Sequence, residues 1–385
     1  MSQESHGRVS MPRPLKVGWA QREYANLRNI IGSPAPNVER VRTGNLFRYP
    51  THALYRAANR LDPLLSNLHW GRRDCDLRHF FNMVSLNHTP WVTTFETALP
   101  RWIETRDWAT GWGMKLLAGA PCRRLIALSD CTAAFQRAVL ADHPDVAAEI
   151  EAKIVVLHPP QPVLVEAPKP APAAGDRIRF VLVGSDFFRK GGAEVLRVFD
   201  RLLERGAPVE LEIVSTLAHG DYATHTTADD LAAARRLIAK WPDRIRHHVR
   251  LSNDAVLDLM RSAHVGLLPT WADTYGYSVL EAQAAGCPVI TTNIRALPEI
   301  NDDRQGWMIP VPRDDRGNGL LATAEARRRF SEVLEAGLEQ AVDTILADPA
   351  SIATKGALAL RRIATMHSPQ RHGEVLREIY DQALA

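Results

Sequence analysis

Cysteine is scarce and unpaired in this chain of 385 residues. Its four cysteines are scattered, at Cys75, Cys122, Cys131 and Cys287, and no two stand in the C-x-x-C spacing of zinc and redox sites. This pattern excludes a disulfide scaffold. The thiols are expected to pack inside a protein kept in a reducing cytoplasm.

Long apolar runs are also missing. No stretch reaches the roughly eighteen consecutive apolar residues that cross a bilayer. Residues 1–20 contain arginines but no apolar segment, so we expect no signal peptide. The expected location is therefore cytoplasmic.

Several cofactor and partner signatures are absent too. Neither the dinucleotide fingerprint G-x-G-x-x-G nor the P-loop pattern occurs, which disfavours a nicotinamide-dependent dehydrogenase. No D-x-D-type acidic cluster is placed to hold a divalent metal; Asp302–Asp303 and Asp314–Asp315 fall in apparent loops. No basic block with interleaved aromatic residues indicates nucleic acid. We therefore expect neither a metal, nor an organic cofactor, nor a nucleic-acid partner.

Charge is unevenly spread along the chain. Residues 1–170 hold 21 Lys+Arg against 15 Asp+Glu, a net +6, and the remainder holds 26 against 29, a net −3. A basic N-terminal half favours peripheral contact with the inner face of a membrane or an acidic acceptor. Arginines scattered over a solvated surface explain the same count.

The length favours two α/β domains. Residues 158–177 are rich in Pro and Ala, which suits a semi-rigid linker. We expect an N-terminal domain over 1–165 and a C-terminal domain over 166–365. A last helix within 366–385 is expected to pack back on the N-terminal domain.

Strands alternate with helices in the C-terminal half, which predicts a parallel, doubly wound sheet. The expected strands are 178–184, 209–215, 248–252, 264–270 and 288–293, and the expected helices 193–206, 253–263 and 277–285. In the N-terminal half we expect strands at 15–20, 91–96, 123–129 and 152–158 and a helix at 133–142. Residues 21–80 show no clear pattern.

The segment PTWADTYGYSVLEAQAAGCPVITT (269–292) carries the strongest candidate site. A strand delivers it to the carboxyl edge of the sheet, where open α/β folds bind ligands. Gly276 permits close backbone approach before a helix whose N-terminus suits a diphosphate. The carboxylates of Asp273 and Glu281 can accept hydrogen bonds from vicinal hydroxyls. Taken alone, the two acids would be a turn residue and a solvated helix residue.

A second segment, VLVGSDFFRKGGAEVL (181–196), ends a strand at Gly184 and enters another helix. Arg189 and Lys190 precede its glycine pair. Two cations at a helix start can neutralise a departing diphosphate. Surface charge is the alternative interpretation of the same two residues.

These two segments, in this order, resemble the retaining glycosyltransferases of family 4, which have the GT-B fold. That fold is α/β, with two Rossmann-like domains facing across a cleft. The resemblance implies that the domain over 1–165 is the acceptor side and that the domain over 166–365 binds the nucleotide-sugar. Three further segments resemble the sequences of this family: LHPP (157–160), ALPEI (296–300) and GWMIPV (306–311). The resemblance covers residues 123–312 best.

The resemblance implies a role for each motif residue. Glu281 would bind the nucleotide ribose and Asp273 the hydroxyls of the donor sugar, while Arg189 and Lys190 would hold the diphosphate. The rest of the donor site would comprise Gly184, Thr274, Tyr275, Gly276, Tyr277 and Ser278. Two positions depart from the family pattern: Asp273 replaces the usual Glu, and Ser185 replaces a common Arg.

The N-terminal half offers weaker candidates. The family's glycine-rich first loop is missing after the first strand. Glu96 ends a predicted strand and is either an acceptor-side base or hydroxyl ligand, or a simple loop contact. His79 and His88 are expected to be structural or surface residues. Core packing is expected for the four tryptophans, although stacking on an acceptor sugar is the alternative: Trp91, Trp102, Trp108 and Trp112. Ser129 and Asp130 end another strand and are candidates to line the cleft.

The predicted activity is metal-independent transfer of a hexosyl group from a UDP- or GDP-sugar, with retention, to a glycan, lipid-linked or small-molecule acceptor. Polysaccharide or glycoconjugate biosynthesis is the expected setting. Three alternatives remain: a sugar-nucleotide epimerase, a phosphorylase, and a catalytically degenerate GT-B protein that binds glycan or nucleotide. An epimerase would turn over without an acceptor, and a phosphorylase with phosphate alone.

Overall fold

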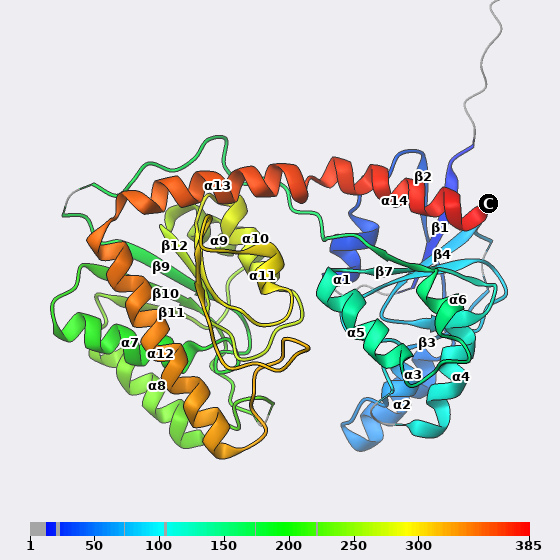
Figure 1. Ribbon diagram of the computed structural model, residues 1–385, viewed down its shortest axis with the longest axis horizontal. Helices are drawn as coiled ribbons and strands as arrows, with labels where there is room; N and C mark the ends of the chain where they lie inside the picture. The colour runs from blue at the N-terminus through cyan, green and yellow to red at the C-terminus, as the bar shows by residue number, and fades with distance from the viewer. Residues whose placement is uncertain (1–12, 21–23, 73, 104–105, 174, 221) are drawn as a thin grey trace, which may run out of the picture. The chain divides into compact units, whose positions relative to one another are not determined.

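The structure is a computed structural model that describes residues 13–20, 24–72, 74–103, 106–173, 175–220 and 222–385 (Figure 1). The chain forms two compact units. Unit 1 comprises Met1–Ala127, Val139–Leu157 and Gln370–Ala385, and unit 2 comprises Leu128–Ala138 and His158–Pro369. The first twelve residues, where no signal peptide is predicted, and residues 21–23 of the first loop lie outside the described residues.

Unit 1 is built on a six-stranded parallel sheet with the order β2-β1-β4-β6-β7-β8. Its strands are β1 Leu15–Trp19, β2 Val38–Arg42, β4 Leu77–Phe81, β6 Trp91–Phe95, β7 Cys122–Ala127 and β8 Ile154–Val156. A separate pair is formed by β3 Leu68–His69 and β5 Val84–Ser85. The four predicted strands of this half are confirmed, whereas β2 and β4 come from the stretch that showed no pattern.

Helices surround this sheet. They are α1 Tyr24–Asn26, the π-helix η1 Leu27–Ile31, α2 Arg48–Ala58, α3 Pro63–Ser66, α4 Asp107–Ala118, α6 Ala147–Glu151 and α14 Pro369–Leu384. Helix α5 Asp130–Leu140 belongs mainly to unit 2, which includes Leu128–Ala138. The C-terminal helix α14 buries Leu376, Ile379 and Tyr380 against Val17 and Val92 of the sheet. Burial of these apolar side chains ties the end of the chain to its beginning.

Unit 2 has a second six-stranded parallel sheet with the order β11-β10-β9-β12-β13-β14. Its strands are β9 Ile178–Val183, β10 Val209–Val214, β11 Ile245–His248, β12 Val265–Leu268, β13 Val289–Thr292 and β14 Trp307–Ile309. The strand predicted at 248–252 was wrong, because β11 ends where that prediction begins. Two such parallel sheets confirm the expected α/β class.

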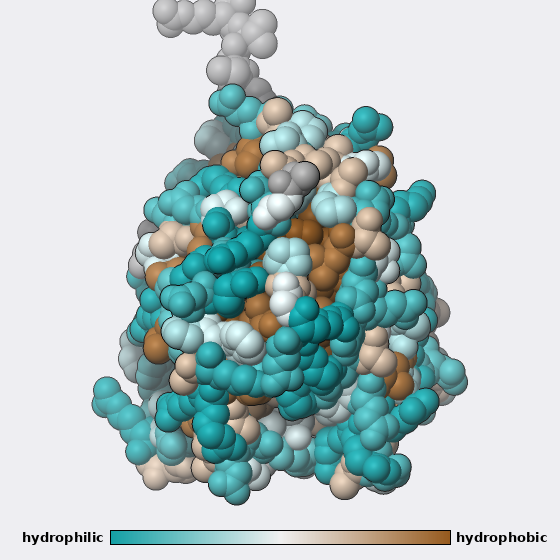
Figure 2. Space-filling view, turned by 90° about the vertical axis from the view of Figure 1, so that its left-hand side faces the viewer, coloured by the Kyte–Doolittle hydropathy of each residue, from teal (hydrophilic) through white to brown (hydrophobic). Residues whose placement is uncertain are grey.

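The helices of unit 2 follow its strands in the usual alternation. They are α7 Gly192–Glu204, α8 Ala228–Lys240, α9 Asn253–Ser262, α10 Tyr277–Ala284, α11 Leu297–Ile300, α12 Ala324–Ala347 and α13 Ala350–Met366. Figure 2 faces the side of unit 2 where α7, α8 and α12 lie, and polar side chains cover most of it. Ion pairs join α7 to α12 there, including Arg201 with Glu335 at 3.0 Å.

The Pro-rich passage before β9 contains no helix or strand in its described residues, yet part of it is anchored on unit 2. The Lys169 ammonium donates to the carbonyl oxygens of Met260 at 2.9 Å and Ala263 at 2.7 Å. It also contacts Cys287 Sγ at 3.0 Å. All four cysteines are free, which confirms the expected absence of disulfides. None of the described helices combines the length and apolar character needed to cross a bilayer.

Candidate functional site

The loop between β9 and α7 requires glycine at two places. A Cβ on Gly184 would lie 2.9 Å from Lys190 Cγ, and one on Gly191 would lie 2.1 Å from the carbonyl oxygen of Pro269. Gly191 also has φ +78°, a conformation that suits glycine. The loop therefore packs directly against the chain that follows β12, as its glycines allow.

This packing brings Arg189, Lys190 and Asp273 together. The Lys190 ammonium forms an ion pair with the Asp273 carboxylate, and Arg189 Nη1 lies 4.0 Å from the same carboxylate. The Asp273 side chain is only 10% exposed. Burial alone raises the pKa of Asp273, but the neighbouring Lys190 and Arg189 outweigh burial and hold it below its ordinary value. Asp273 is therefore a buried carboxylate that stays ionised between two cations.

The chain from β12 to α10 is fixed by contacts with the same loop. Trp271 N donates to the Arg189 carbonyl oxygen at 2.8 Å, and the Thr270 hydroxyl donates to it at 2.9 Å. Gly276, with φ +96°, is the N-cap of α10, and a Cβ there would lie 2.7 Å from Leu297 Cδ2. These contacts hold the start of α10 beside Arg189.

The first turn of α10 contains an unsatisfied hydroxyl. Ser278 Oγ is buried and has no hydrogen-bond partner among the described residues. A buried hydroxyl without a partner is costly, and here it lies at a helix N-terminus that attracts anions. Glu281 follows on the same helix with a half-buried side chain. Tyr277, also half-buried, lies with its ring 5.6 Å from that of the buried Tyr275.

A cavity of about 450 Å³ opens at this edge of the unit 2 sheet. Its polar lining includes Arg189, Tyr222, Asp273, Thr274, Arg295 and Asn318. Its size falls within the range of small-molecule sites. The cavity lining thus combines Arg189 of the segment 181–196 with Asp273 of the segment 269–292.

Arg295 is a lining residue that the sequence analysis missed. It follows β13, which is hydrogen-bonded to β12, so both strands end at the same edge of the sheet. Arg295 has φ +51°, and its guanidinium lies 3.9 Å from the centre of the Phe135 ring. The sequence signal that could have identified Arg295 is its position as a basic residue shortly after the strand predicted at 288–293.

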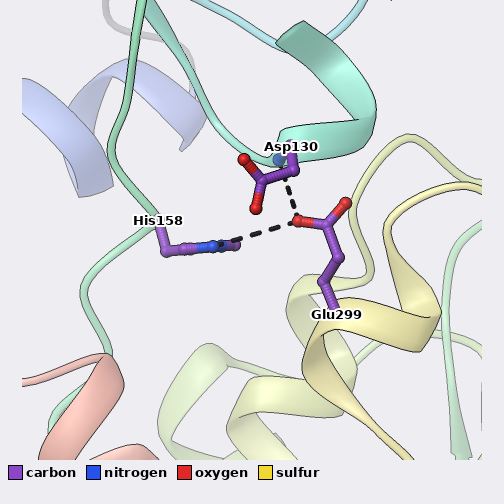
Figure 3. Close-up of side chains that lie close together, drawn as sticks. All are labelled: Asp130, His158 and Glu299. Atoms are coloured by element: carbon purple, nitrogen blue, oxygen red, sulfur yellow. Dashed lines mark hydrogen bonds and ion pairs between the residues drawn. The ribbon is translucent and has the colours of Figure 1, made fainter. Parts of the chain in front are cut away.

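Asp130, His158 and Glu299 form a further polar cluster in unit 2 (Figure 3). Their possible ligand atoms lie within 4.8 Å of one another. The Glu299 carboxylate already accepts hydrogen bonds from the backbone N–H groups of Asp130 at 2.9 Å and Cys131 at 2.7 Å. It therefore caps the start of α5, a role that explains the cluster without a metal ion.

The same cluster reaches the candidate donor loop. His158 Nδ1 lies 2.9 Å from the Tyr275 hydroxyl, and His158 Nε2 lies 3.9 Å from Glu299 Oε2. Burial lowers the pKa of His158 and raises the pKa of Glu299. These shifts favour the uncharged form of each group, so the cluster orients Tyr275 chiefly through hydrogen bonding.

Glu96 lies in unit 1, directly after β6. Its Oε1 accepts from Asn82 Nδ2 at 3.1 Å and from Arg101 Nη1 at 3.4 Å. The predicted alternative of a loop contact is therefore present. Its possible role toward an acceptor stays a prediction.

The other candidates of the N-terminal half divide into core and surface residues. Trp91 and Trp102 are buried, as predicted for core residues, whereas Trp108 and Trp112 are exposed and that prediction was wrong for them. His79 is a buried structural residue, as expected, with hydrogen bonds to Tyr380 and Thr94. His88 is exposed. The buried Ser129 hydroxyl accepts a hydrogen bond from Thr132 N at 3.0 Å.

Part of the chain is similar in sequence to known glycosyltransferases. Residues 177–324 match the family described as Glycosyl transferases group 1. D-inositol 3-phosphate glycosyltransferase of Streptomyces griseus is 28% identical over 145 residues, 37% of this chain and 29% of that protein. Glycogen synthase of Mycobacterium tuberculosis is 28% identical over 34% of this chain and 27% of that protein. The aligned part thus spans under a third of these relatives.

Solved structures match nearly the whole chain. Sucrose-phosphate synthase of Thermosynechococcus elongatus has a TM-score of 0.58 at 14% identity and covers 96% of this chain and 98% of its own. HepE of Anabaena, in complex with UDP, has a TM-score of 0.60 at 11% identity and covers 95% and 99%. The fold is therefore GT-B, with two Rossmann-like domains. Together with the family match, it supports a GT-B glycosyltransferase.

Proposed function

We propose that this protein transfers a sugar from a UDP- or GDP-sugar to an acceptor hydroxyl, with retention of anomeric configuration. The observation that carries the proposal is the cavity of unit 2, which is lined by Arg189, Asp273 and Thr274, shortly before the chain enters α10. Its setting at the carboxyl edge of a parallel sheet favours a nucleotide ligand. The proposed wider role is glycan or glycoconjugate biosynthesis in the cytoplasm.

The diphosphate is assigned to Arg189, Lys190 and the start of α10. The two cations and the helix N-terminus place positive charge where the leaving group gains negative charge. The Ser278 hydroxyl, which has no partner among the described residues, supplies a further donor. We assign the neutralisation to these groups rather than to a metal ion.

The sugars are assigned to the two acids. Glu281 would accept hydrogen bonds from the ribose hydroxyls, and Asp273 from the hydroxyls of the transferred sugar. The Lys190 ammonium keeps Asp273 ionised and thus an acceptor only. The adjoining residues Thr274 and Tyr275, with Gly184 and Tyr277, would complete the donor site.

The transfer breaks the bond between the anomeric carbon and the leaving phosphate oxygen and forms one to the acceptor oxygen. The acceptor proton would pass to the leaving phosphate, as the family resemblance implies. Glu96 in unit 1 is proposed as an acceptor-side ligand. Its carboxylate is held in place by Asn82 and Arg101.

Nucleotide binding is the first test. Melting temperatures of wild type and Glu281→Ala would be compared with UDP, GDP, ADP and their sugars at millimolar concentration. We expect one nucleotide to raise the melting temperature of the wild type but not of Glu281→Ala. Glu339→Ala, another half-buried helical glutamate of unit 2, is the matched control and should keep the shift. Absence of any shift, checked by calorimetry, would contradict the proposal and favour the degenerate-scaffold alternative.

Turnover separates the remaining alternatives. With the identified donor, nucleotide release that requires an acceptor and gives a retained linkage by NMR is the expected result. Conversion of the donor without acceptor would instead indicate an epimerase, and release driven by inorganic phosphate a phosphorylase. An inverted linkage would contradict the assignment of retention.

A further inference from the structure

Helix α2 of unit 1 is exposed along almost its whole length. None of its eleven residues is buried, and Tyr49, Leu54 and Tyr55 are 74%, 43% and 47% exposed. A helix this short is marginal in water on its own, and most helices bury an apolar face. The exposed tyrosines and leucine therefore indicate that a partner covers α2.

Further exposed apolar residues lie in the segments next to α2. Leu46 N donates to the Trp70 carbonyl oxygen at 2.8 Å, so these two exposed residues are adjacent. At the other end, an ion pair between Asp62 and Arg106 joins the segment after α2 to the start of α4, which carries Trp108. We call the whole set the α2 surface: Leu46, Tyr49, Leu54, Tyr55, Leu61, Trp70 and Trp108.

Positive charge dominates α2 and the residues next to it, and the acid Asp62, which follows Leu61, is paired with Arg106. Residues 40–61 contain five arginines and no acidic residue. Arg48, Arg56 and Arg60 are exposed in and just after α2. Arginine-rich helices with exposed aromatic side chains are typical of proteins that lie in the headgroup region of a bilayer. Tyrosine and tryptophan favour this interface because their rings are apolar and their tips polar.

We propose that the α2 surface binds peripherally to a membrane that contains anionic lipids. The arginines would attract the headgroups, and the tyrosines, tryptophans and leucines would enter the interface. Tyrosine, tryptophan and arginine also occur at protein interfaces, so the excess of positive charge over residues 40–61 is the observation that favours an anionic membrane. Five of the arginines that make the N-terminal half basic thus lie between residues 40 and 61, in or near α2.

The position of the α2 surface in unit 1 indicates which class of acceptor the proposed enzyme uses. Helix α2 follows β2, and Glu96 follows β6, so the parallel sheet brings both to the same carboxyl edge of unit 1. If the proposed transferase activity holds, on which this step rests, the acceptor class is a hydroxyl presented at the membrane surface. A lipid-linked saccharide or a glycolipid headgroup has this chemistry.

Vesicle co-sedimentation of the full chain tests the contact. We expect binding to phosphatidylcholine vesicles that contain phosphatidylglycerol, and little binding to phosphatidylcholine alone. Each arginine near an anionic surface contributes about fivefold, so Arg48→Gln with Arg56→Gln should weaken binding about thirtyfold at low salt. Tyr49→Ser with Tyr55→Ser should weaken it through lost apolar insertion. Arg250→Gln, which removes an exposed arginine of unit 2, is the matched control and should bind as wild type does.

Two results would overturn the proposal. One is no preference for anionic vesicles in the wild type; the other is equal binding by the wild type and both double variants. Self-association that the variants abolish would instead assign the α2 surface to a second copy of this chain. Circular dichroism confirms that the variants are folded. The nucleotide-induced melting shift, measured on the same samples, reports the donor site separately, so either proposal can fail alone.

Discussion

The two units bury polar groups in different ways. In unit 2, buried acids are paired with cations: Asp273 with Lys190, and Glu212 with Arg246. In unit 1, the buried histidines His69 and His79 have pKa values lowered chiefly by burial, that of His69 to about 4. These two acids of unit 2 are thus compensated by ion pairs, whereas these two buried histidines of unit 1 stay neutral.

Their surfaces differ as well. On unit 2, arginines of α7 meet acids of α12, as Arg197 does with Glu335 at 2.7 Å. On unit 1, the α2 surface combines exposed arginines with aromatic residues, and its sequence offers no acid over residues 40–61. The arginines of α7 are therefore paired with acids of unit 2 itself, whereas the α2 surface is suited to an external partner.

The largest expected effect comes from breaking the buried ion pair of unit 2. Lys190→Ala should lower the free energy of unfolding by about 3–5 kcal/mol, because it leaves Asp273 buried with only Arg189 nearby. Urea unfolding of the full chain measures this loss. Arg13→Ala, which breaks the exposed ion pair with Asp76 in unit 1, is the control and should leave unfolding almost unchanged. Equal effects of the two variants would refute the contrast between buried and exposed pairs.

A medium effect is expected from acidifying unit 1. The folded pKa of His69 is about 4, below the value of about 6.5 in an unfolded chain, so between these pH values the unfolded state binds more protons. Stability should therefore fall as pH falls through this window, by about 2 kcal/mol from His69 at about pH 5. Urea unfolding at neutral pH and near pH 5, followed by tryptophan fluorescence, measures the change.

The variant His69→Gln isolates this contribution. It should be less stable than the wild type at neutral pH, because His69 contacts Ser85 Oγ at 3.2 Å and the Gly44 carbonyl oxygen at 3.1 Å. Its stability should nevertheless depend less steeply on pH. His88→Gln, at an exposed histidine, should retain the pH dependence of the wild type. An unchanged slope in His69→Gln would show that this histidine is not the group responsible.

Local sequence patterns predicted the parts of the fold where an apolar run ends at a glycine. Strand β9 and helix α10 were found because each is mostly apolar and Gly184 or Gly276 lies at a boundary. Strand β11 was misplaced because its Arg246 pairs with Glu212 on the neighbouring strand, so burial does not require an apolar residue there. Strand β2, with the sequence VERVR, was missed because charged residues alternate along it.

The candidate site shows the same limit. Arg189, Lys190 and Asp273 were predicted because each motif carries its own strand, glycine and helix. Arg295 was missed because it lines the cavity only through the pairing of β13 with β12, which no local pattern reveals. Trp108 was misassigned to the core for a related reason, since helical spacing alone does not show which face of α4 is covered.

The smallest expected effect tests whether α4 of unit 1 tolerates added side chains on its exposed face. Gly111 is exposed in this helix, and a Cβ there would meet no atom within 4 Å. Gly111→Ala should therefore stabilise the protein by about 0.5–1 kcal/mol, because alanine loses less backbone entropy in a helix. Gly113, two positions later, is buried, and its Cβ would lie 2.6 Å from Pro100 Cγ, so Gly113→Ala should destabilise. Thermal and urea unfolding of both variants give the signs. The two substitutions lie in the same helix and gain the same helix propensity, so opposite signs reflect packing. Two destabilised variants would mean that the exposed face of α4 is covered, and two stabilised variants would mean that the buried face accommodates a methyl group.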